Sequence, residues 1–229
     1  MKRSLFALLL VLAVVALAGC APEVRLLDET KLKDLSLLSG EPCEAPCWNG
    51  IVPGETLYRD AKLSIEEDTR YKDVQEAERK EGSDARIFGF GPEDGQVCCQ
   101  VFSRDGETVT SLLLQFAPDM TLGPVMDRYG EPVYVGGEAP AADQAYMALV
   151  YPEAPLVIYA FVAGAENGRL STGSEILGAM YMSQDEMDLL LACSRLYVWE
   201  GFVGFKQTID ENFDFIGEEF ENEEVCGSA

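Results

Sequence analysis

The sequence Ala145-Tyr146-Met147-Ala148-Leu149-Val150-Tyr151 is followed by Pro152-Glu153-Ala154-Pro155 and then by Leu156-Val157-Ile158-Tyr159-Ala160-Phe161-Val162-Ala163. Two apolar runs of strand length thus flank a short connection that contains two prolines. The connection is too short for the crossover that parallel strands require, so the two runs are expected to pair as antiparallel strands. This strand pair indicates an antiparallel sheet, and the flanking sequence continues the pattern.

Further strand-like runs lie on both sides of this pair. Strands are expected over residues 86–91, 96–103, 108–116, 133–136 and 175–182. Asp105-Gly106 lies between the second and third of these runs and is a hairpin turn signal. Because the connections are hairpins rather than long crossovers, the sequence predicts an α+β fold in which short helices pack on an antiparallel meander sheet.

Short helices are expected between the groups of strands. The first is expected to begin at residue 57, and a charged, largely exposed helix is expected to follow over residues 66–81. Two more are expected over residues 122–129 and 184–194. Thr56 would cap the first helix and Thr121 would cap the helix over residues 122–129. Gly130 would end that helix.

The N-terminus carries an export signal. Lys2 and Arg3 precede an apolar run over residues 5–17, which leads into Leu17-Ala18-Gly19-Cys20. A short basic region before an apolar core of this length is a secretory signal peptide, since the core is too short for a stable span. The tetrapeptide resembles the lipobox of bacterial lipoproteins. The resemblance implies cleavage before Cys20 and a diacylglyceryl group on its sulfur. The alternative is an ordinary signal peptide that happens to end at a cysteine.

The charge and the residue types exclude several functions. The chain has 40 acidic and 17 basic residues and no histidine. Loss of residues 1–19 would remove Lys2 and Arg3, which leaves 15 basic residues and a net charge of −25. Such a surface repels nucleic acid, so nucleic-acid binding is not expected. Without histidine, the chain lacks the commonest general base and metal ligand. The acidity is typical of solubility outside the cell; a cationic partner or divalent ions are the alternatives.

Seven cysteines are present, and Cys20 is assigned to the lipid. The other six are Cys43, Cys47, Cys98, Cys99, Cys193 and Cys226. An even number in an exported protein indicates disulfides. Cys98 and Cys99 lie in a strand-like run, so their side chains should point to opposite faces and should not bond to each other. We expect one bond from the Cys43/Cys47 segment to Cys98 or Cys99, and a second bond between Cys193 and Cys226. A zinc site of four thiolates is the alternative.

The order helix, strands, helix, strands is consistent with two divergent copies of one module. Gly54-Glu55-Thr56 and Asp119-Met120-Thr121 would open the equivalent helices. Coincidence of common turn chemistry explains the same similarity, so both interpretations stay open. The expected organisation is a signal peptide (1–19), a lipidated tether (20–40), two α+β modules (41–118 and 119–208) and an acidic C-terminal tail (209–229).

Two resemblances follow from these phrases. The helix-plus-meander order resembles the SmpA/OmlA-type small lipoproteins and the related β-lactamase-inhibitor-protein fold, in which Gly-x-Thr precedes a helix that ends at Gly-x-Pro. Gly54-Glu55-Thr56 matches the first phrase and Gly130-Glu131-Pro132 matches the second, but neither unit carries both. This resemblance implies helices packed on an antiparallel sheet and a non-enzymatic binding role in envelope assembly. The phrase from Pro46 to Thr56 is similar to one in uncharacterised bacterial lipoproteins and implies no activity.

No catalytic motif is present. The chain has no nucleophile elbow, phosphate-binding glycine loop or histidine-based metal motif. A cysteine nucleophile would lack a histidine base. A pair of carboxylates, as in glycosidases, is the remaining catalytic option, but no pair stands out among the 40 acids. The chain is therefore not expected to be an enzyme.

Two stretches near the C-terminus are candidate binding sites. One carries the spacing of an EF-hand-like calcium loop, with possible ligands at Asp210, Asn212, Asp214, Glu218 and Glu221. Phe215 stands where that loop needs glycine, and a solvated acidic tail is the alternative. The other stretch would form an exposed aromatic patch of Tyr197, Trp199, Phe202 and Phe205. The same spacing is typical of a buried strand that bends at a glycine.

These features predict a non-catalytic binding or envelope-structure module that is anchored through the Cys20 lipid. Its expected location is the extracytoplasmic side of the cell membrane or of an outer membrane, and its expected partner is a protein of the cell envelope. The alternative is an ion- or solute-binding lipoprotein with calcium at the acidic tail. A carboxylate-based hydrolase is a third reading. No cofactor is expected, apart from calcium in the alternative.

Overall fold

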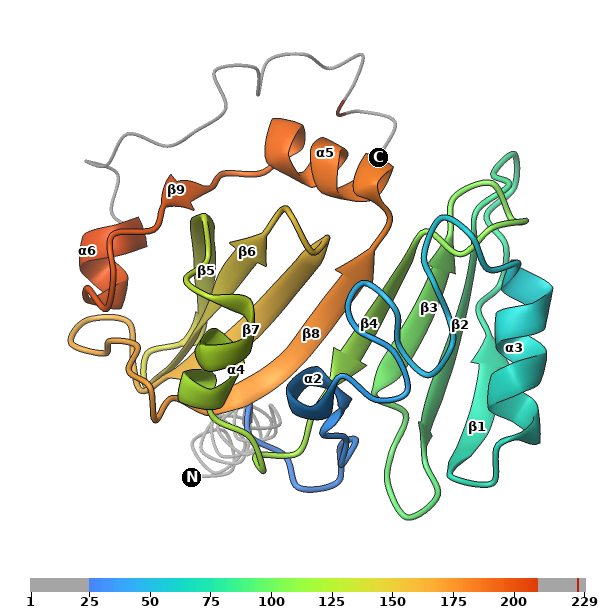
Figure 1. Cartoon of the computed structure of the whole chain (residues 1–229), viewed down its shortest axis with the longest axis horizontal. Helices are drawn as coiled ribbons and strands as arrows, with labels where there is room; N and C mark the ends of the chain where they lie inside the picture. The colour runs from blue at the N-terminus through green and yellow to red at the C-terminus, as the bar shows by residue number, and fades with distance from the viewer. Residues whose placement is uncertain (1–24, 210–225, 227–229) are drawn as a thin grey trace, which may run out of the picture.

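A computed structural model describes residues 25–209 and Cys226. Its centre is one nine-stranded sheet in which neighbouring strands are antiparallel (Figure 1). The strands are β1 (Tyr71–Glu76), β2 (Arg86–Pro92), β3 (Cys99–Ser103), β4 (Ser111–Gln115), β5 (Tyr134–Ala141), β6 (Gln144–Tyr151), β7 (Leu156–Val162), β8 (Ile176–Met182) and β9 (Tyr197–Val198). The helices are α2 (Ser36–Ser39), α3 (Tyr58–Glu67), α4 (Leu122–Tyr129), α5 (Gln184–Cys193) and α6 (Phe205–Ile209). The α+β class with an antiparallel meander sheet is confirmed.

The strand order is β1-β2-β3-β4-β8-β7-β6-β5-β9. One half of the sheet is the meander β1 to β4, and the other half contains the meander β5 to β8. The two halves meet where β4 pairs with β8, from Ser111 opposite Met182 to Gln115 opposite Gly178. The predicted hairpin of β6 and β7 is present, with Tyr151 opposite Leu156 next to its turn.

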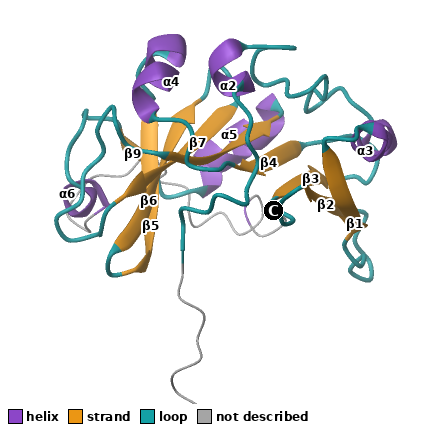
Figure 2. Cartoon of the chain, turned by 90° about the horizontal axis from the view of Figure 1, so that it is seen from below, coloured by secondary structure: helices purple, strands orange, loops and turns teal. Residues whose placement is uncertain are grey.

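The two faces of the sheet differ in what covers them. Along one row, Phe88, Val101, Leu112, Tyr181 and Leu156 are cross-strand neighbours, and all belong to the main core cluster. The buried residues of α2, α3 and α4 belong to the same cluster. Figure 2 shows α2 and α4 on one side of the sheet. We call this the helix-covered face; residues from both halves of the sheet share its core.

Among the described elements, the helix α5 covers part of the opposite face. From α5, Met187, Leu190 and Leu191 pack on a second cluster that includes Val150 and Val157. Ser183 caps this helix, because its Oγ accepts a hydrogen bond from the Glu186 backbone N–H at 3.3 Å. We call this side of the sheet the open face.

The prediction of a helix over residues 66–81 is wrong. Tyr71–Glu76 forms the edge strand β1, which pairs with β2. Its charged residues are typical of a helix surface, but they equally protect the edge of a sheet from further pairing. Pairing with β2 satisfies the backbone groups on one side of this segment, and local helix or strand propensity does not include that long-range contact.

The two threonine caps are also wrong. The Oγ of Thr56 accepts a hydrogen bond from the Val52 N–H at 2.8 Å, so it closes the preceding turn instead of capping α3. Thr121 makes no side-chain cap. Carbonyl groups of a distant loop accept from the first N–H groups of α4, with Leu122 donating to Ser174 and Gly123 to Thr172. Gly130 does end α4, with a φ of 77° that favours glycine.

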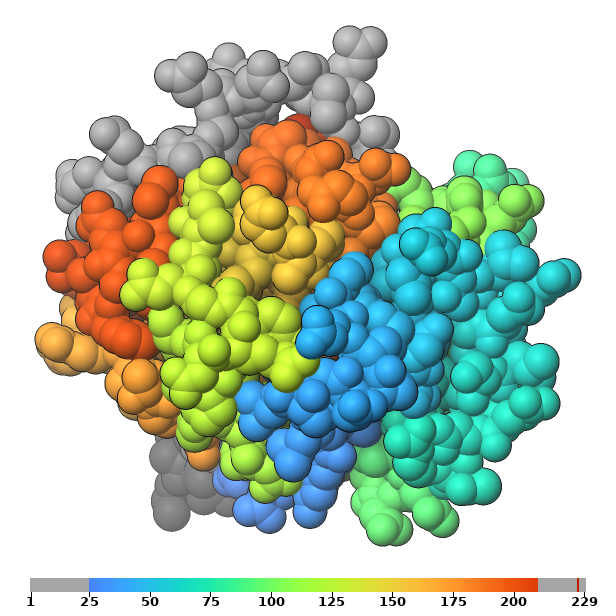
Figure 3. All heavy atoms as spheres, in the orientation of Figure 1, coloured from blue at the N-terminus to red at the C-terminus, as the bar shows by residue number. Residues whose placement is uncertain are grey.

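The prediction of a tether over residues 20–40 is wrong for its described part, residues 25–40. Leu32 pairs with Phe116 in a parallel bridge, and the Leu32 N–H donates to the Gln115 carbonyl at 3.1 Å. Leu37 is 1% exposed and lies in the main core. Leu32 and Leu37 therefore bury apolar surface instead of remaining in solvent, whereas Leu35 is 54% exposed. We call residues 25–38 the N-terminal strap; Figure 3 shows it in blue beside α4.

The cysteines are partly as expected. Cys193 and Cys226 form a disulfide, which confirms that prediction. The prediction of a disulfide from Cys43 or Cys47 to Cys98 or Cys99 is wrong. Cys43 and Cys47 bond to each other within one turn, with Cα atoms 5.6 Å apart. Cys98 and Cys99 are free and buried. As expected, they do not bond to each other. The prediction that their side chains point to opposite faces is wrong, because Cys98 precedes β3 and both residues belong to the main core. Four cysteines are thus in disulfides, which argues against the zinc alternative.

Several predictions concern residues outside the described part of the chain: the signal peptide, the Cys20 lipid site, the calcium ligands from Asp210 to Glu221 and nearly all of the acidic tail. Among the helices that the structure describes, none is long and apolar enough to cross a bilayer.

The turn between β3 and β4 gives a prediction about pH. Asp105 accepts hydrogen bonds from the N–H groups of Glu107 and Thr108, each at 2.8 Å, and these bonds lower its pKa from 3.8. A lowered pKa stabilises the fold above the unfolded pKa, and the effect is lost as pH falls through the folded pKa. Asp105→Asn keeps an acceptor oxygen but removes the charge. The variant should therefore melt below the parent at neutral pH, and the difference should vanish in acid. Thermal melts across pH measure this; a difference independent of pH would contradict it.

Candidate functional site

The open face carries partly exposed apolar side chains beside α5, and one of them, Met180, also packs against the cluster under this helix. Val97, Ile87, Phe102, Leu113 and Met180 lie there, and we call them the apolar strip. Ile87 pairs with Phe102, and Leu113 pairs with Met180. Val97 is 42% exposed and the other four are half-buried. A contiguous apolar surface of this kind on a folded domain is typical of a site that binds another molecule.

A hollow of about 390 Å³ lies beside this strip, where the N-terminal strap meets the sheet. Its lining consists of Arg25, Leu26, Asp28 and Lys31 from the strap and Leu113, Leu114, Gln115, Tyr146, Tyr159, Leu177 and Gly178 from the sheet. Gln115, Gly178 and Tyr159 are successive cross-strand neighbours. Gly178 allows the close approach of β4, because a Cβ at this position would lie 2.3 Å from the Leu114 carbonyl oxygen.

The tyrosine pair forms one wall of this hollow. The rings of Tyr146 and Tyr159 meet edge to face, with centroids 5.9 Å apart. The Oη of Tyr146 donates to Glu138 Oε2 at 2.9 Å, and the Oη of Tyr159 lies 3.8 Å from the Met180 sulfur. Burial raises the pKa of Tyr146 to about 12 and also raises the pKa of Tyr159. Both hydroxyls therefore stay neutral at physiological pH, and the site offers apolar ring surface rather than a base.

A second hollow of about 540 Å³ lies on the other side of the same two tyrosines. Leu190 of α5 lines it on one side together with Ser194 and Arg195, which follow the helix, and β5, β6 and β7 line it on the other. Tyr146 and Tyr159 thus form a ridge between two hollows. The open face thus presents two hollows that share the rings of Tyr146 and Tyr159.

The aromatic patch expected near the C-terminus is not gathered on the surface. Tyr197 and Phe205 are buried in the main core, and Tyr197 also lines the second hollow. Trp199 is half-buried, and Phe202 is 37% exposed with its ring edge to face against Trp199, centroids 5.6 Å apart. The alternative of a buried segment holds for two of the four residues, so the patch is reduced to Trp199 and Phe202.

Metal binding finds no support in the described part of the chain. Within residues 25–209 and Cys226, no group of three or more histidine, cysteine or acidic side chains is placed to hold a metal ion. The possible calcium ligands at Asp210, Asn212, Asp214, Glu218 and Glu221 lie outside the described residues.

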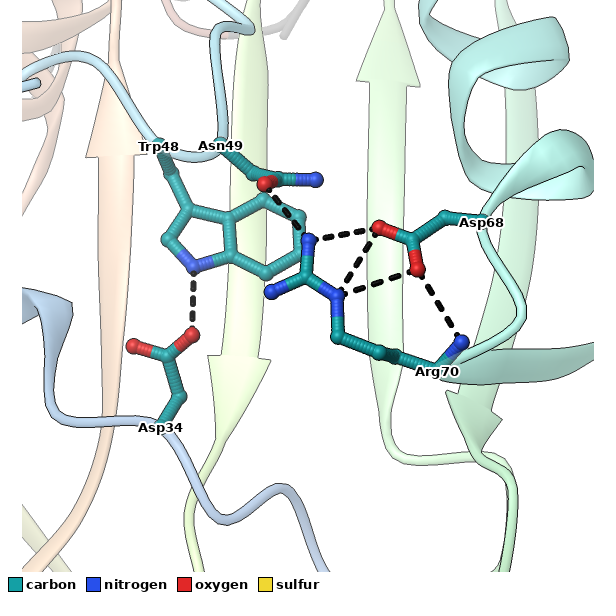
Figure 4. Close-up of polar contacts among 5 residues, drawn as sticks. All are labelled: Asp34, Trp48, Asn49, Asp68 and Arg70. Carbon is teal, nitrogen blue, oxygen red and sulfur yellow. Dashed lines mark hydrogen bonds and ion pairs between the residues drawn. The ribbon is translucent and has the colours of Figure 1, made fainter. Parts of the chain in front are cut away.

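A polar cluster beside Trp48 organises a third hollow of about 550 Å³, which Asp34 and Arg70 help to line. The guanidinium of Arg70 donates to Asn49 Oδ1 at 2.9 Å and to the Asp68 carboxylate at 3.0 Å, and the Trp48 indole N–H donates to Asp34 at 3.3 Å (Figure 4). The hydrogen bonds from Arg70 lower the pKa of Asp68. These groups satisfy one another, so the cluster fastens the strap and β1 to the Trp48 turn.

The phrase from Pro46 to Thr56 has a structural explanation. Trp48 and Ile51 exchange backbone hydrogen bonds of 3.0 and 2.8 Å around a two-residue turn. Asn49 and Gly50 occupy the turn with φ of 50° and 81°, which is why asparagine and glycine stand there. The turn holds the Trp48 ring against Tyr71 and Phe90.

Sequence reasoning placed Tyr146 and Tyr159 in strands but did not single them out. The two strands that contain these tyrosines carry apolar residues on both faces of the sheet, because α5 covers part of the open face. The alternation that separates a buried face from an exposed one is therefore lost.

The fold and the site define a mostly-β α+β domain with one open, partly apolar sheet face. Comparisons of the chain with protein-family models, with curated proteins and with solved structures find no match in any of the three.

Proposed function

We propose that this chain is a lipoprotein of the bacterial cell envelope, anchored through Cys20, which acts as a non-catalytic binding module. The observation that carries the proposal is the open face: half-buried apolar side chains and a tyrosine ridge on a rigid sheet. A rigid scaffold with exposed apolar surface favours recognition, since little conformational entropy is lost on binding. The Cys193–Cys226 and Cys43–Cys47 disulfides support an oxidising, exported location.

The partner that we propose for the apolar strip is a protein of the envelope. Phe102 and Leu113 stand on neighbouring strands of this strip, and polar Gln100 and Gln115 flank them on the same face. An apolar centre with a polar rim is the usual anatomy of a protein interface.

In-cell crosslinking tests the protein partner. A photo-crosslinking residue at position 102 should give one discrete protein adduct, and Leu113→Gln should reduce its yield at least tenfold, because interface centres carry most of the binding energy. Leu63→Gln, on the exposed surface of α3 with Leu63 52% exposed, is the matched control and should leave the yield unchanged. No adduct, or equal loss with both substitutions, would argue against this surface.

Substitution of the lipid cysteine tests the anchor. Cys20→Ala should abolish incorporation of labelled fatty acid into the chain and should leave the signal peptide uncut by the lipoprotein pathway, because no thiol remains to accept the diacylglyceryl group. Mass spectrometry of the N-terminal peptide and gel autoradiography measure both. Continued labelling of the variant would defeat the proposal.

We propose further that the two halves are divergent copies of one module. In the first half, α3 precedes the meander β1 to β4, and in the second half, α4 precedes the meander β5 to β8. The last strand of each meander lies at the seam. This order of elements supports the repeat. A helix followed by a meander is also the order by which the chain resembles the SmpA/OmlA-type lipoproteins and the β-lactamase-inhibitor-protein fold.

A further inference from the structure

We propose that the hollow of about 390 Å³ beside Tyr146 and Tyr159 receives part of an acyl chain from an anionic phospholipid of the bilayer that holds the protein. This inference rests on the proposed function, because the lipid on Cys20 is what brings the hollow to the membrane. It goes further, since it assigns a second lipid contact, at a defined site, to a chain anchored by its N-terminus.

The first argument is the length of chain between the anchor and the hollow. Arg25 and Leu26 line the hollow, and Cys20 precedes Arg25 by five positions. Five residues span at most about 18 Å when fully extended. The headgroup region on each side of the hydrocarbon core is roughly 5–8 Å thick. Arg25, at the edge of the hollow, therefore lies no more than about 18 Å from the lipidated residue.

The second argument is that the strap holds its place at the hollow. The Leu26 N–H donates to the Gln144 side-chain oxygen on β6 at 2.8 Å, and Leu32 bridges to Phe116 further along the strap. These contacts fix Leu26 to one strand and Leu32 beside the end of another. The lipid on Cys20 consequently pulls this side of the domain toward the bilayer.

The third argument is the chemistry of the lining. Leu26, Leu113 and Leu177 and the two tyrosine rings supply apolar surface. Arg25, Lys31 and Asp28 are the charged residues of the lining, and Lys31 lies 3.9 Å from Asp28 in an ion pair. The lining thus carries one net positive charge in a chain whose mature form carries −25. An apolar floor with a basic rim complements an acyl chain that ends in an anionic headgroup. The volume lies at the lower end of the range for small-molecule sites, about 300–1,000 Å³.

Photo-crosslinking in vesicles tests the inference. The lipidated protein is reconstituted in phosphatidylcholine vesicles with or without phosphatidylglycerol, with benzoylphenylalanine in place of Tyr159. Tyr129 is the matched control position, since it is a half-buried tyrosine on α4 at the helix-covered face. The expected result is a phospholipid adduct at position 159, at least fivefold above position 129. Equal yields at both positions, or adducts with protein alone, would overturn the inference.

Isotope labels and charge variants separate the sources. Deuterated vesicle lipids should give deuterated adducts; an unlabelled adduct would mean that the lipid of Cys20 itself enters the hollow, against the inference. Arg25→Gln and Lys31→Gln should each lower the yield in phosphatidylglycerol vesicles about fivefold, as expected for one basic side chain near an anionic surface. Arg59→Gln on α3 should not, since Arg59 lies on the other face of the sheet.

A measurement without substitution in the hollow guards against misfolding. The parent protein, released from phosphatidylglycerol vesicles in mild detergent, should keep one phospholipid in its native mass spectrum, and its absence would count against the site. Failure of Cys20 labelling would defeat the anchor proposal; normal labelling without a lipid adduct would defeat this inference alone.

Discussion

Trp48→Ala should lower the free energy of unfolding by about 3–5 kcal/mol, as expected for removal of a large buried aromatic side chain. Trp48 is 1% exposed, and its ring centroid lies 5.7 Å from that of Tyr71 and 5.8 Å from that of Phe90. Its indole N–H also donates to Asp34 of the N-terminal strap at 3.3 Å. The substitution therefore leaves a cavity under the strap and removes a bond that holds it. Urea unfolding followed by circular dichroism, with both disulfides intact, measures the loss.

Two further substitutions show whether packing is the cause. Trp48→Phe keeps an aromatic ring but loses the bond to Asp34, so most of the stability should remain; one such hydrogen bond contributes about 0.5–1.5 kcal/mol. Phe202→Ala, at an aromatic residue that is 37% exposed, should cost far less than Trp48→Ala. If Trp48→Ala proves no worse than Phe202→Ala, the Trp48 turn does not anchor the core as described.

Leu112→Ala should destabilise the whole chain by about 2–5 kcal/mol. Leu112 is fully buried on β4 at the seam between the two halves, opposite Val101 of β3 and Tyr181 of β8. The cavity therefore opens in the core that both halves share. Because each half buries its apolar face against that core, the variant should still unfold in one transition, at a lower urea concentration.

The next residue in the same strand is the control. Leu113 lies on the open face and is half-buried, so Leu113→Ala should cost less than about 1.5 kcal/mol. A Leu112→Ala variant that unfolds in two separate transitions would show that the halves fold independently. Equal costs for Leu112→Ala and Leu113→Ala would contradict the assignment of the two faces.

Much of the fold follows from local patterns. The paired runs over residues 145–163 form β6 and β7, and the turn signal at Asp105-Gly106 lies between β3 and β4. The stop at Gly130 and the helix over Gln184–Cys193 were also expected from periodicity and turn chemistry. These elements could be predicted because the residues that determine them are neighbours in sequence.

Less of the candidate site than of the fold could be predicted from local sequence patterns. Tyr146 and Tyr159 lie in expected strands, but nothing in the sequence distinguishes them from their apolar neighbours. The segment expected to be a tether packs on the domain where the structure describes it, because Leu32 and Leu37 belong to the core. Both outcomes have one cause: exposure on the open face depends on where α5 and the strap lie, and neither contact is local.

The sequence by itself determined the antiparallel α+β class, the absence of histidine chemistry, the acidic surface and the expectation of export. These properties depend on composition and on short-range spacing. Only the tertiary structure decided that Tyr71–Glu76 joins the sheet as an edge, that Cys43 bonds to Cys47, and that Leu32 and Leu37 belong to the core. Each of those outcomes is selected by competition between distant partners for burial and hydrogen bonds, which no local pattern encodes.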